Sequence, residues 1–321
     1  MTVVRVHRIV GKAWHTEEGS AALSAAIAGA PTWPAWIEAV APDAAECAAL
    51  VRAFGLRERS LEDALEPQHP PLFREFDDHL VLIVHAPETG ERRETRKVAL
   101  FLGRRWLVTI VRAPLPLLDP LHEQLRRHPD YYLAAPELVA HAILDHMAQV
   151  FEERVDEMID RAESLSDRSL EHPEADVLPR LHHLRRRAAA FTRVVRAQRD
   201  VCQSLARGGS PFLSRGVEPY MRDVADHMLR VYDLLESVRD GILAARDSYL
   251  TAVNNQLNRT MRTLTAVATI LLPLALVAGI FGMNFARMPL LENPSGFWIV
   301  VGAMAFCAVG LYGWLKSRRW L

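Results

Sequence analysis

Four asparagines near the C-terminal end of the chain have side chains suited to a hydrated metal ion. Asn254, Asn255 and Asn258 precede an uncharged run, and Asn284 follows it in the tripeptide Gly282-Met283-Asn284. Mg²⁺ gives up its water shell reluctantly, so neutral amides can hydrogen-bond to that shell instead of replacing it. An unpaired amide in lipid would cost several kcal/mol, so these side chains indicate a water-filled environment.

The elements that must position these amides are two long uncharged runs. Leu264 to Phe281 is eighteen residues without a charge, and Phe297 to Leu315 follows after a loop of fifteen residues. At about 1.5 Å per residue, the first run reaches about 27 Å as a helix, close to the thickness of a bilayer core. We therefore expect a membrane hairpin over residues 263–321. The alternative, a buried hairpin in a soluble protein, does not account for the charges around the runs.

The charges that flank the two runs predict their orientation. The basic residues at the outer ends of the hairpin are Arg259, Arg262, Lys316, Arg318 and Arg319. The loop between the runs holds only Arg287, which Glu292 offsets. By the positive-inside rule, both termini are expected in the cytoplasm of a multi-pass protein of the inner or plasma membrane, surrounded by lipid.

Average composition conceals this organisation. The chain is 24% charged and has a net charge of −1, as an ordinary soluble protein would. Cys47, Cys202 and Cys307 are far apart, which indicates neither a disulfide framework nor a thiolate metal site. The first ten residues lack an apolar signal core, so the late runs are expected to drive insertion. Glycine-rich nucleotide loops and a nucleophile elbow are absent, and nothing indicates an enzyme.

Residues 1–130 are predicted to form a cytosolic α/β domain. Runs rich in β-branched and aromatic residues predict strands at Val3–Ile9, Leu80–His85, Val98–Leu102 and Trp106–Val111. Gly103-Arg104 predicts a tight hairpin between the last two of these strands. Asp43 predicts the start of a helix over Ala44–Phe54, and Ser60 is expected to cap the turn that holds Glu62.

Residues 131–262 are predicted to form a cytosolic helical hairpin and a long stalk helix. An acidic block over 151–176 precedes an arginine-rich block over 180–199. Either block could be a binding surface, the second even for nucleic acid, but the prolines between them favour an antiparallel hairpin in which opposite charges face each other. We therefore expect no nucleic-acid partner. A continuous helix from Pro219 to Phe281 would have 63 residues and span about 95 Å, a long stalk that needs partner helices.

One face of this long helix changes in character along its length. Steps of three and four residues from Asp247 give Thr251, Asn254, Asn258, Met261, Thr265, Ala268, Leu272, Ala275, Gly279 and Gly282. We call this set the seam. Small residues in a membrane helix usually indicate helix packing, but packing does not explain the asparagines. If identical helices surround an axis, the amides form rings around water, which predicts a pore.

The seam and its surroundings resemble a known family. The run AxxTILLPLALVAGIFGMNF, a short loop, a second span and the tail KSRRWL are similar to the CorA family of divalent-cation channels. The resemblance implies an α+β membrane protein: a homopentameric funnel of cytosolic domains, a helical stalk and two transmembrane helices. It also implies inward flow of Mg²⁺, and often Co²⁺ or Ni²⁺, through a pore lined by the first span.

The resemblance assigns roles to individual residues. Gly282, Met283 and Asn284 correspond to the selectivity filter, and Asn258 and Met261 to the pore path. Asp247 corresponds to an intracellular regulatory site for Mg²⁺, for which Glu88, Glu91 and Glu94 are the candidate partners, with no choice among them. Mg²⁺ is thus implied as both transported and regulatory ion, with no other cofactor.

The chain also departs from the family pattern. Ala286 and Leu290 stand where many members carry acids, and Ala275 stands where many carry threonine. These changes leave the preferred cation open. The zinc-transporting ZntB branch is the nearest alternative. A membrane-anchored sensor or scaffold is a third, but a simple tether does not predict an amide-bearing seam.

Overall fold

The chain folds into two compact units in a computed structural model. Residues 3–10, 13–29, 35–88, 95–132, 135–171, 174, 176–283, 290, 293–318 and 320 are described. The first unit comprises Met1–Ser166 with Leu178–Ala245, and the second comprises Asp167–Val177 with Arg246–Leu321. Each unit is described by itself below.

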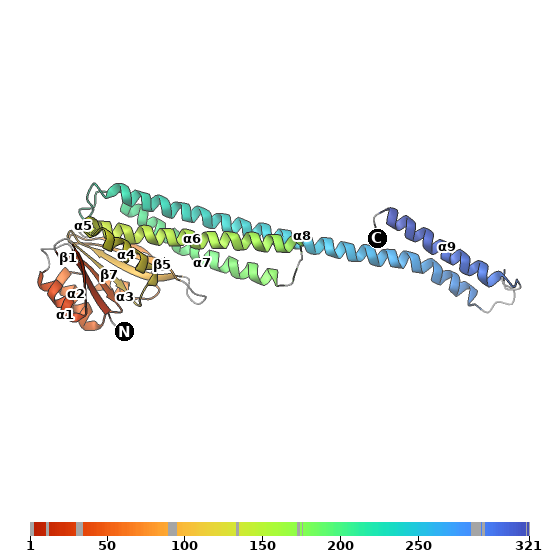
Figure 1. Ribbon diagram of the computed structural model, residues 1–321, viewed down its shortest axis with the longest axis horizontal. Helices are drawn as coiled ribbons and strands as arrows, with labels where there is room; N and C mark the ends of the chain where they lie inside the picture. The colour runs from red at the N-terminus through yellow and green to blue at the C-terminus, as the bar shows by residue number, and fades with distance from the viewer. Residues whose placement is uncertain are drawn as a thin grey trace. The chain divides into compact units, whose positions relative to one another are not determined.

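The first unit contains a seven-stranded mixed sheet (Figure 1). The strands are β1 (Val3–Val10), β2 (Ala13–Glu18), β3 (Ala35–Val40), β4 (Leu72–Glu75), β5 (Leu80–Pro87), β6 (Thr95–Leu102) and β7 (Trp106–Val111). Their spatial order is β2-β1-β3-β7-β6-β5-β4, and the β3–β7 pair is parallel while the other pairs are antiparallel. All four predicted strands are present, and β2, β3 and β4 are additional to them.

Helices cover both faces of the sheet because the central strands are apolar on both sides. The short helices are α1 (Ser20–Gly29), α2 (Ala44–Phe54), α3 (Glu58–Leu65), η1 (Pro116–Leu118), α4 (Asp119–Arg127) and α5 (Pro129–Tyr132). Helices α1, α2 and α3 share one core with the sheet, in which Leu23, Leu50 and Leu61 pack with Ile83 and Phe101. The helix α4 lies on the other face (Figure 1). The predicted α/β domain is confirmed.

Local signals in this domain had mixed outcomes. Asp43 caps α2 through a capping box with Glu46, as its position predicted. The β6–β7 hairpin is also confirmed, and a side chain at Gly103 would collide with the indole of Trp106 at 2.3 Å. The prediction for Ser60 is wrong: α3 begins at Glu58, so Ser60 lies buried inside the helix instead of capping it.

Two long helices, α6 (Pro136–Glu171) and α7 (Val177–Ala206), form the predicted hairpin (Figure 1). Their described contact is apolar, with Phe151 edge-on to Phe191 at 5.6 Å between ring centroids. Glu157 pairs with Arg154 and Arg161 of its own helix. Apolar packing therefore contributes to this contact, and the facing of opposite charges across the hairpin stays a prediction. In α7, Gln198 accepts a hydrogen bond of 2.8 Å from the backbone N–H of His85 in β5.

The longest helix, α8 (Glu218–Phe281), has 64 residues and confirms the continuous helix predicted from Pro219. Its first part belongs to the first unit, where His227 lies 2.7 Å from the Glu152 carboxylate of α6. Its second part and α9 (Gly296–Ser317) belong to the second unit. Both helices are long and apolar enough to cross a membrane, and only 6% of each apolar window is buried. The two predicted spans are therefore present as helices.

Candidate functional site

The seam lies along one exposed face of α8. Every seam residue from Asp247 to Gly282 is exposed in the single chain. The exposure includes large apolar side chains, since Met261 is 53% exposed and Leu272 is 75% exposed. An apolar helix face of this kind needs a cover that its own chain does not supply.

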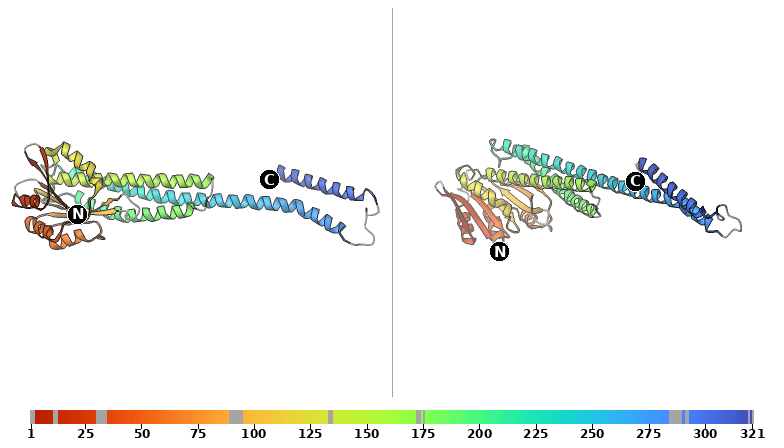
Figure 2. Two further views of the ribbon diagram at one scale, coloured as in Figure 1. Left: turned by 60° about the horizontal axis from the view of Figure 1, so that its bottom comes forward. Right: turned by 45° about the vertical axis from the view of Figure 1, so that its right-hand side comes forward.

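Helix α9 occupies the other side of α8. Pro273, Leu274 and Val277 line a cavity of about 240 Å³ whose α9 wall consists of Ile299, Val300, Ala303, Met304 and Cys307. Figure 2 shows α9 running back beside the end of α8. At about 100° per residue, the seam and these three residues centre about 170° apart around the helix. The second span thus covers the back of α8 at these residues and leaves the seam free as far as Gly279, while Gly282 lines a second cavity with Phe297 and Val301.

The two glycines at the end of the seam, Gly279 and Gly282, differ in the space that the chain leaves for a side chain. A side chain at Gly282 would approach the carbonyl oxygen of Ala278 to 3.2 Å, so the end of the helix itself favours glycine there. A side chain at Gly279 would meet nothing within 4 Å. The described part of the chain therefore gives no reason for the small size of Gly279.

Gly282 and Met283, the described residues of the tripeptide, form the C-terminal end of α8. The backbone N–H of Gly282 donates to Ala278 at 2.9 Å, and that of Met283 donates to Ile280 at 3.2 Å. Met283 is exposed. Asn284 lies outside the described residues, so its role in a selectivity filter stays a prediction.

The polar part of the seam carries amides and hydroxyls. Asn254, Asn258 and Thr265 are exposed on the seam. The nearby hydroxyl of Thr269 donates to the carbonyl of Thr265 at 2.8 Å, so it serves the helix backbone. From Leu264 to Met283 the helix and its end carry no charged side chain. Any ion on this face would meet neutral groups only.

The predicted regulatory residues are partly described. Asp247 is exposed, as are Asp226, Asp233 and Asp240 at seven-residue intervals before it. Glu88 is paired with Arg96 in the first unit. Glu91 and Glu94 lie outside the described residues. The pairing of Asp247 with any of the three glutamates stays a prediction.

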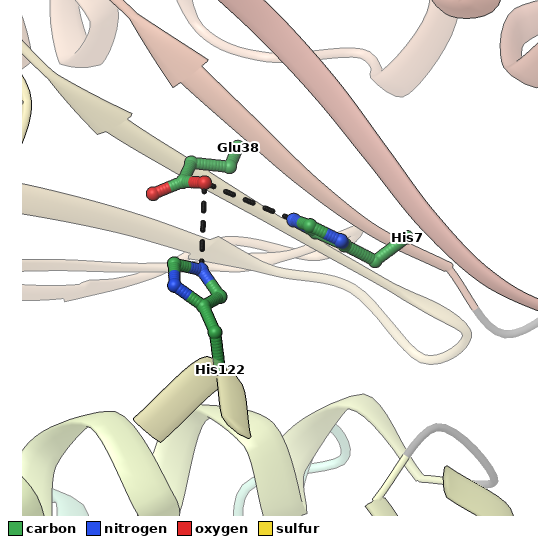
Figure 3. A group of neighbouring side chains, drawn as sticks. All are labelled: His7, Glu38 and His122. Atoms are coloured by element: carbon green, nitrogen blue, oxygen red, sulfur yellow. Dashed lines mark ion pairs between the residues drawn. The ribbon is translucent and has the colours of Figure 1, made fainter. Parts of the chain in front are cut away.

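The structure brings together one cluster that the sequence did not reveal. His7 of β1, Glu38 of β3 and His122 of α4 have potential ligand atoms within 4.8 Å of one another (Figure 3). The three residues are far apart in the sequence and share no spacing motif. The register of β1 against β3 creates the proximity, since Val6 pairs with Ile37 and His7 with Trp36. Only the order of the strands could have revealed it.

Comparisons with known proteins agree on one protein family. The family model described as "CorA-like Mg2+ transporter protein" matches residues 34–318. The "Cobalt/magnesium transport protein CorA" of Thermotoga maritima is 29% identical over 280 residues, which is 84% of this chain and 78% of that protein.

Two solved structures show the fold. The complete CorA magnesium transporter of Methanocaldococcus jannaschii has a TM-score of 0.78 at 22% identity and covers 100% of this chain and 99% of its own. The ZntB cytoplasmic domain of Vibrio parahaemolyticus has a TM-score of 0.62 at 11% identity and covers 79% of this chain and 98% of its own. The match to the complete transporter includes the two apolar helices, which confirms the predicted membrane-protein fold.

Proposed function

Because this chain belongs to the family of CorA-like Mg²⁺ transporter proteins, we propose that it conducts Mg²⁺ across a membrane through a pore built from several copies of α8. The family consists of transporters, so the site is one of passage and not of catalysis. A homopentamer is the proposed assembly, with the five seams facing a common axis.

The observation that carries this proposal is the free seam. Helix α9 covers the opposite side of α8, so the exposed seam residues are available to other copies. An amide-bearing face that meets its symmetry mates encloses polar groups around an axis, where water can fill the space. A helix that merely anchored a cytosolic domain would have no use for Asn254 and Asn258 on its uncovered side.

The chemistry of the seam suits a hydrated ion. Mg²⁺ demands near-octahedral oxygen ligands and dehydrates slowly, so a pore that conducts it must let it keep water. Neutral amides and threonine hydroxyls hydrogen-bond to that water without binding the ion tightly, and conduction requires binding weak enough to release. We assign the narrowest selective point to Gly282, Met283 and Asn284.

The membrane potential then supplies the direction of flow. The basic residues around the spans support cytoplasmic termini in an inner or plasma membrane. With the inside negative, each doubly charged ion gains about 4.6 kcal/mol per 100 mV on entry. Passive influx through a channel is therefore sufficient, and the charge-free span offers no acid or histidine for proton coupling.

We further propose that intracellular Mg²⁺ closes the pore by binding at Asp247. Five like-charged stalks repel one another, and a divalent ion between neighbours relieves the repulsion. Glu88, Glu91 and Glu94 are the candidates for the second carboxylate. When Mg²⁺ is scarce, the stalks separate and the pore opens.

Flux measured ion by ion in liposomes tests the transport proposal. The parental protein is expected to admit Mg²⁺, and Co²⁺ or Ni²⁺ to a lesser degree. Asn284→Ala should assemble normally yet lose selective uptake, because it removes the mouth amide and no core contact. Faster entry of Zn²⁺ than of Mg²⁺ would favour the ZntB-like alternative. If no divalent ion enters at all, the hairpin is a tether and the channel proposal is wrong.

A further inference from the structure

A buried trio of side chains lies in the first unit, apart from the proposed pore residues. The Glu38 carboxylate oxygen Oε2 is 3.8 Å from Nε2 of His7 and 3.5 Å from Nε2 of His122 (Figure 3). His7 is 1% exposed and Glu38 is 4% exposed. Protein interiors are mostly apolar, so it is unusual for two imidazoles and one carboxylate from three elements to meet there.

The facing nitrogen atoms have no hydrogen-bond partner. Nε2 of His7 and Nε2 of His122 are both buried and unsatisfied, although each points toward Glu38. Nδ1 of His7 lies 3.0 Å from Oγ1 of Thr16. When Nδ1–H donates to Thr16, Nε2 presents a lone pair to the carboxylate. In that tautomer two lone-pair donors face each other, and a cation between them would satisfy both.

The spacing fits a small metal ion. Zinc binds nitrogen and oxygen at about 2.0–2.2 Å, so neighbouring ligand atoms in a tetrahedral site lie roughly 3.3 Å apart. The two carboxylate–imidazole separations, 3.8 and 3.5 Å, are close to this value, and all three ligand atoms lie within 4.8 Å of one another. The Thr16 hydroxyl would act as the orienting partner that metal-bound imidazoles usually have.

Aromatic packing holds the imidazoles in place. Trp36 is fully buried and stacks on His122 at 5.1 Å between ring centroids, and its ring is tilted by 34° against that of His7 at 4.6 Å. Its indole N–H donates to the Thr109 hydroxyl at 3.1 Å, which fixes the ring. The ligands are therefore preorganised, and little side-chain freedom is left to lose on binding.

A cavity of about 250 Å³ lies beside the trio, lined by His7, His122 and polar side chains that include Thr16, Glu18 and Glu123. Water in this cavity can supply a fourth ligand. Arg5 also lies 3.4 Å from Glu38, but its shorter contact, 2.8 Å, is to Glu18. A structural ion pair between Arg5 and Glu38 is the competing explanation of the cluster.

We propose that His7, Glu38 and His122 bind one Zn²⁺ or a similar first-row transition-metal ion, with water from the cavity as the remaining ligand. Imidazole ligands favour such ions over Mg²⁺, which prefers oxygen. The site is therefore distinct in chemistry from the proposed pore and from the carboxylates proposed for regulation. It would let the cytosolic domain bind a transition metal while the pore conducts Mg²⁺.

The test uses the full-length protein in detergent with excess Mg²⁺, which occupies the oxygen-rich sites. Zn²⁺ bound per chain is measured by equilibrium dialysis, and Co²⁺ serves as a spectroscopic probe. The parental protein should bind one equivalent of Zn²⁺ and give the intense visible absorption of four-coordinate Co²⁺. Binding of no Zn²⁺, or only the weak spectrum of six-coordinate Co²⁺, would overturn the proposal.

Variants assign the site to these residues. Glu38→Gln and His122→Asn should weaken Zn²⁺ binding by about 100-fold or more, since each removes a ligand. Thr16→Val keeps all three ligands and should weaken it by about tenfold to 100-fold, the usual effect of losing an orienting partner. His15→Asn, a change to an exposed histidine in the same sheet, is the control and should bind as the parent does.

Equal Zn²⁺ binding by all four variants would place the metal elsewhere and contradict the proposal. Mg²⁺ flux in liposomes is the readout for folding of the variants and should be retained. A failure of the parental protein to conduct Mg²⁺ bears on the channel proposal and leaves the Zn²⁺ titration interpretable.

Discussion

Val277 and Gly279 are two positions apart on α8 and face opposite ways. Val277 lines the cavity against α9, whereas Gly279 is exposed with no atom within 4 Å of the place a side chain would take. Residues two positions apart in an α-helix differ by about 160° in direction, so Val277 and Gly279 necessarily face opposite sides. The chain covers one side itself and leaves the other free, and this free side is the one that we propose meets its copies.

This relationship predicts the effect of bulk at Gly279. Gly279→Leu should disrupt assembly or block Mg²⁺ flux, because the added side chain enters a face that meets other subunits. Native mass measurement and liposome flux check the two effects. Gly302→Leu is the matched control, since Gly302 in α9 also has nothing within 4 Å but lies outside the seam. If both variants assemble and conduct Mg²⁺ as the parent does, the seam is not part of a subunit interface.

The asparagines before the first span lie on different faces of α8, so a variant on the seam can be compared with one off it. Asn258→Ala should lower Mg²⁺ flux about fivefold or more, the factor that corresponds to one lost hydrogen bond of about 1 kcal/mol. Asn255→Ala should have little effect, since Asn255 is also exposed but lies off the seam. Similar losses in the two variants would mean that the amides act through general polarity and not through a pore face.

The regulatory proposal concerns Asp247. Asp247→Ala should weaken the protection that millimolar Mg²⁺ gives the cytosolic part against protease, because the ion loses a carboxylate between subunits. Asp240→Ala, a change to an exposed aspartate one heptad earlier, should leave the protection intact. If Asp247→Ala leaves the protection unchanged, Asp247 is an ordinary solvent-exposed aspartate, like Asp226, Asp233 and Asp240.

The stability of the first unit should depend on pH through His85. Burial lowers the pKa of His85 although its Nε2–H donates to the carbonyl of His69 at 2.9 Å, and Lys97 lowers it further. The unfolded chain then binds more protons, so stability is present above the ordinary pKa of about 6.5 and is lost as the pH falls below it. His85→Gln should reduce the fall in melting temperature between about pH 7 and pH 5. An identical fall would assign it to other groups.

The helices and most central strands could be predicted because their signals are local. Uncharged runs gave α9 and the end of α8, the lack of proline from Tyr220 to Leu272 gave the rest of α8, and β-branched runs gave β5, β6 and β7. β2 and β4 are short and polar at sheet edges, so their pairing decides their structure. Ser60 failed as a cap because a helix can begin without one, and α3 begins at Glu58.

The same distinction separates the two candidate sites. The seam could be predicted because residues three and four apart must share a helix face. The trio of His7, Glu38 and His122 depends on which strands are neighbours and on where α4 crosses the sheet. No local periodicity encodes that arrangement. Asn284 and the partner of Asp247 depend on contacts between copies, which a single chain cannot specify.

The central claim, that the seam of α8 lines the pore, is tested most directly by cysteine scanning. Cys47, Cys202 and Cys307 are first replaced, and single cysteines are introduced along α8. The seam positions are Thr265, Ala268, Leu272, Ala275 and Gly279, and the opposite positions are Ala266, Ile270, Leu274 and Val277. A small, positively charged thiol reagent that cannot cross lipid is then added during Mg²⁺ flux. The reagent should block flux at the seam positions and spare the opposite ones. Block at the opposite positions, or at both sets alike, would contradict a pore lined by the seam.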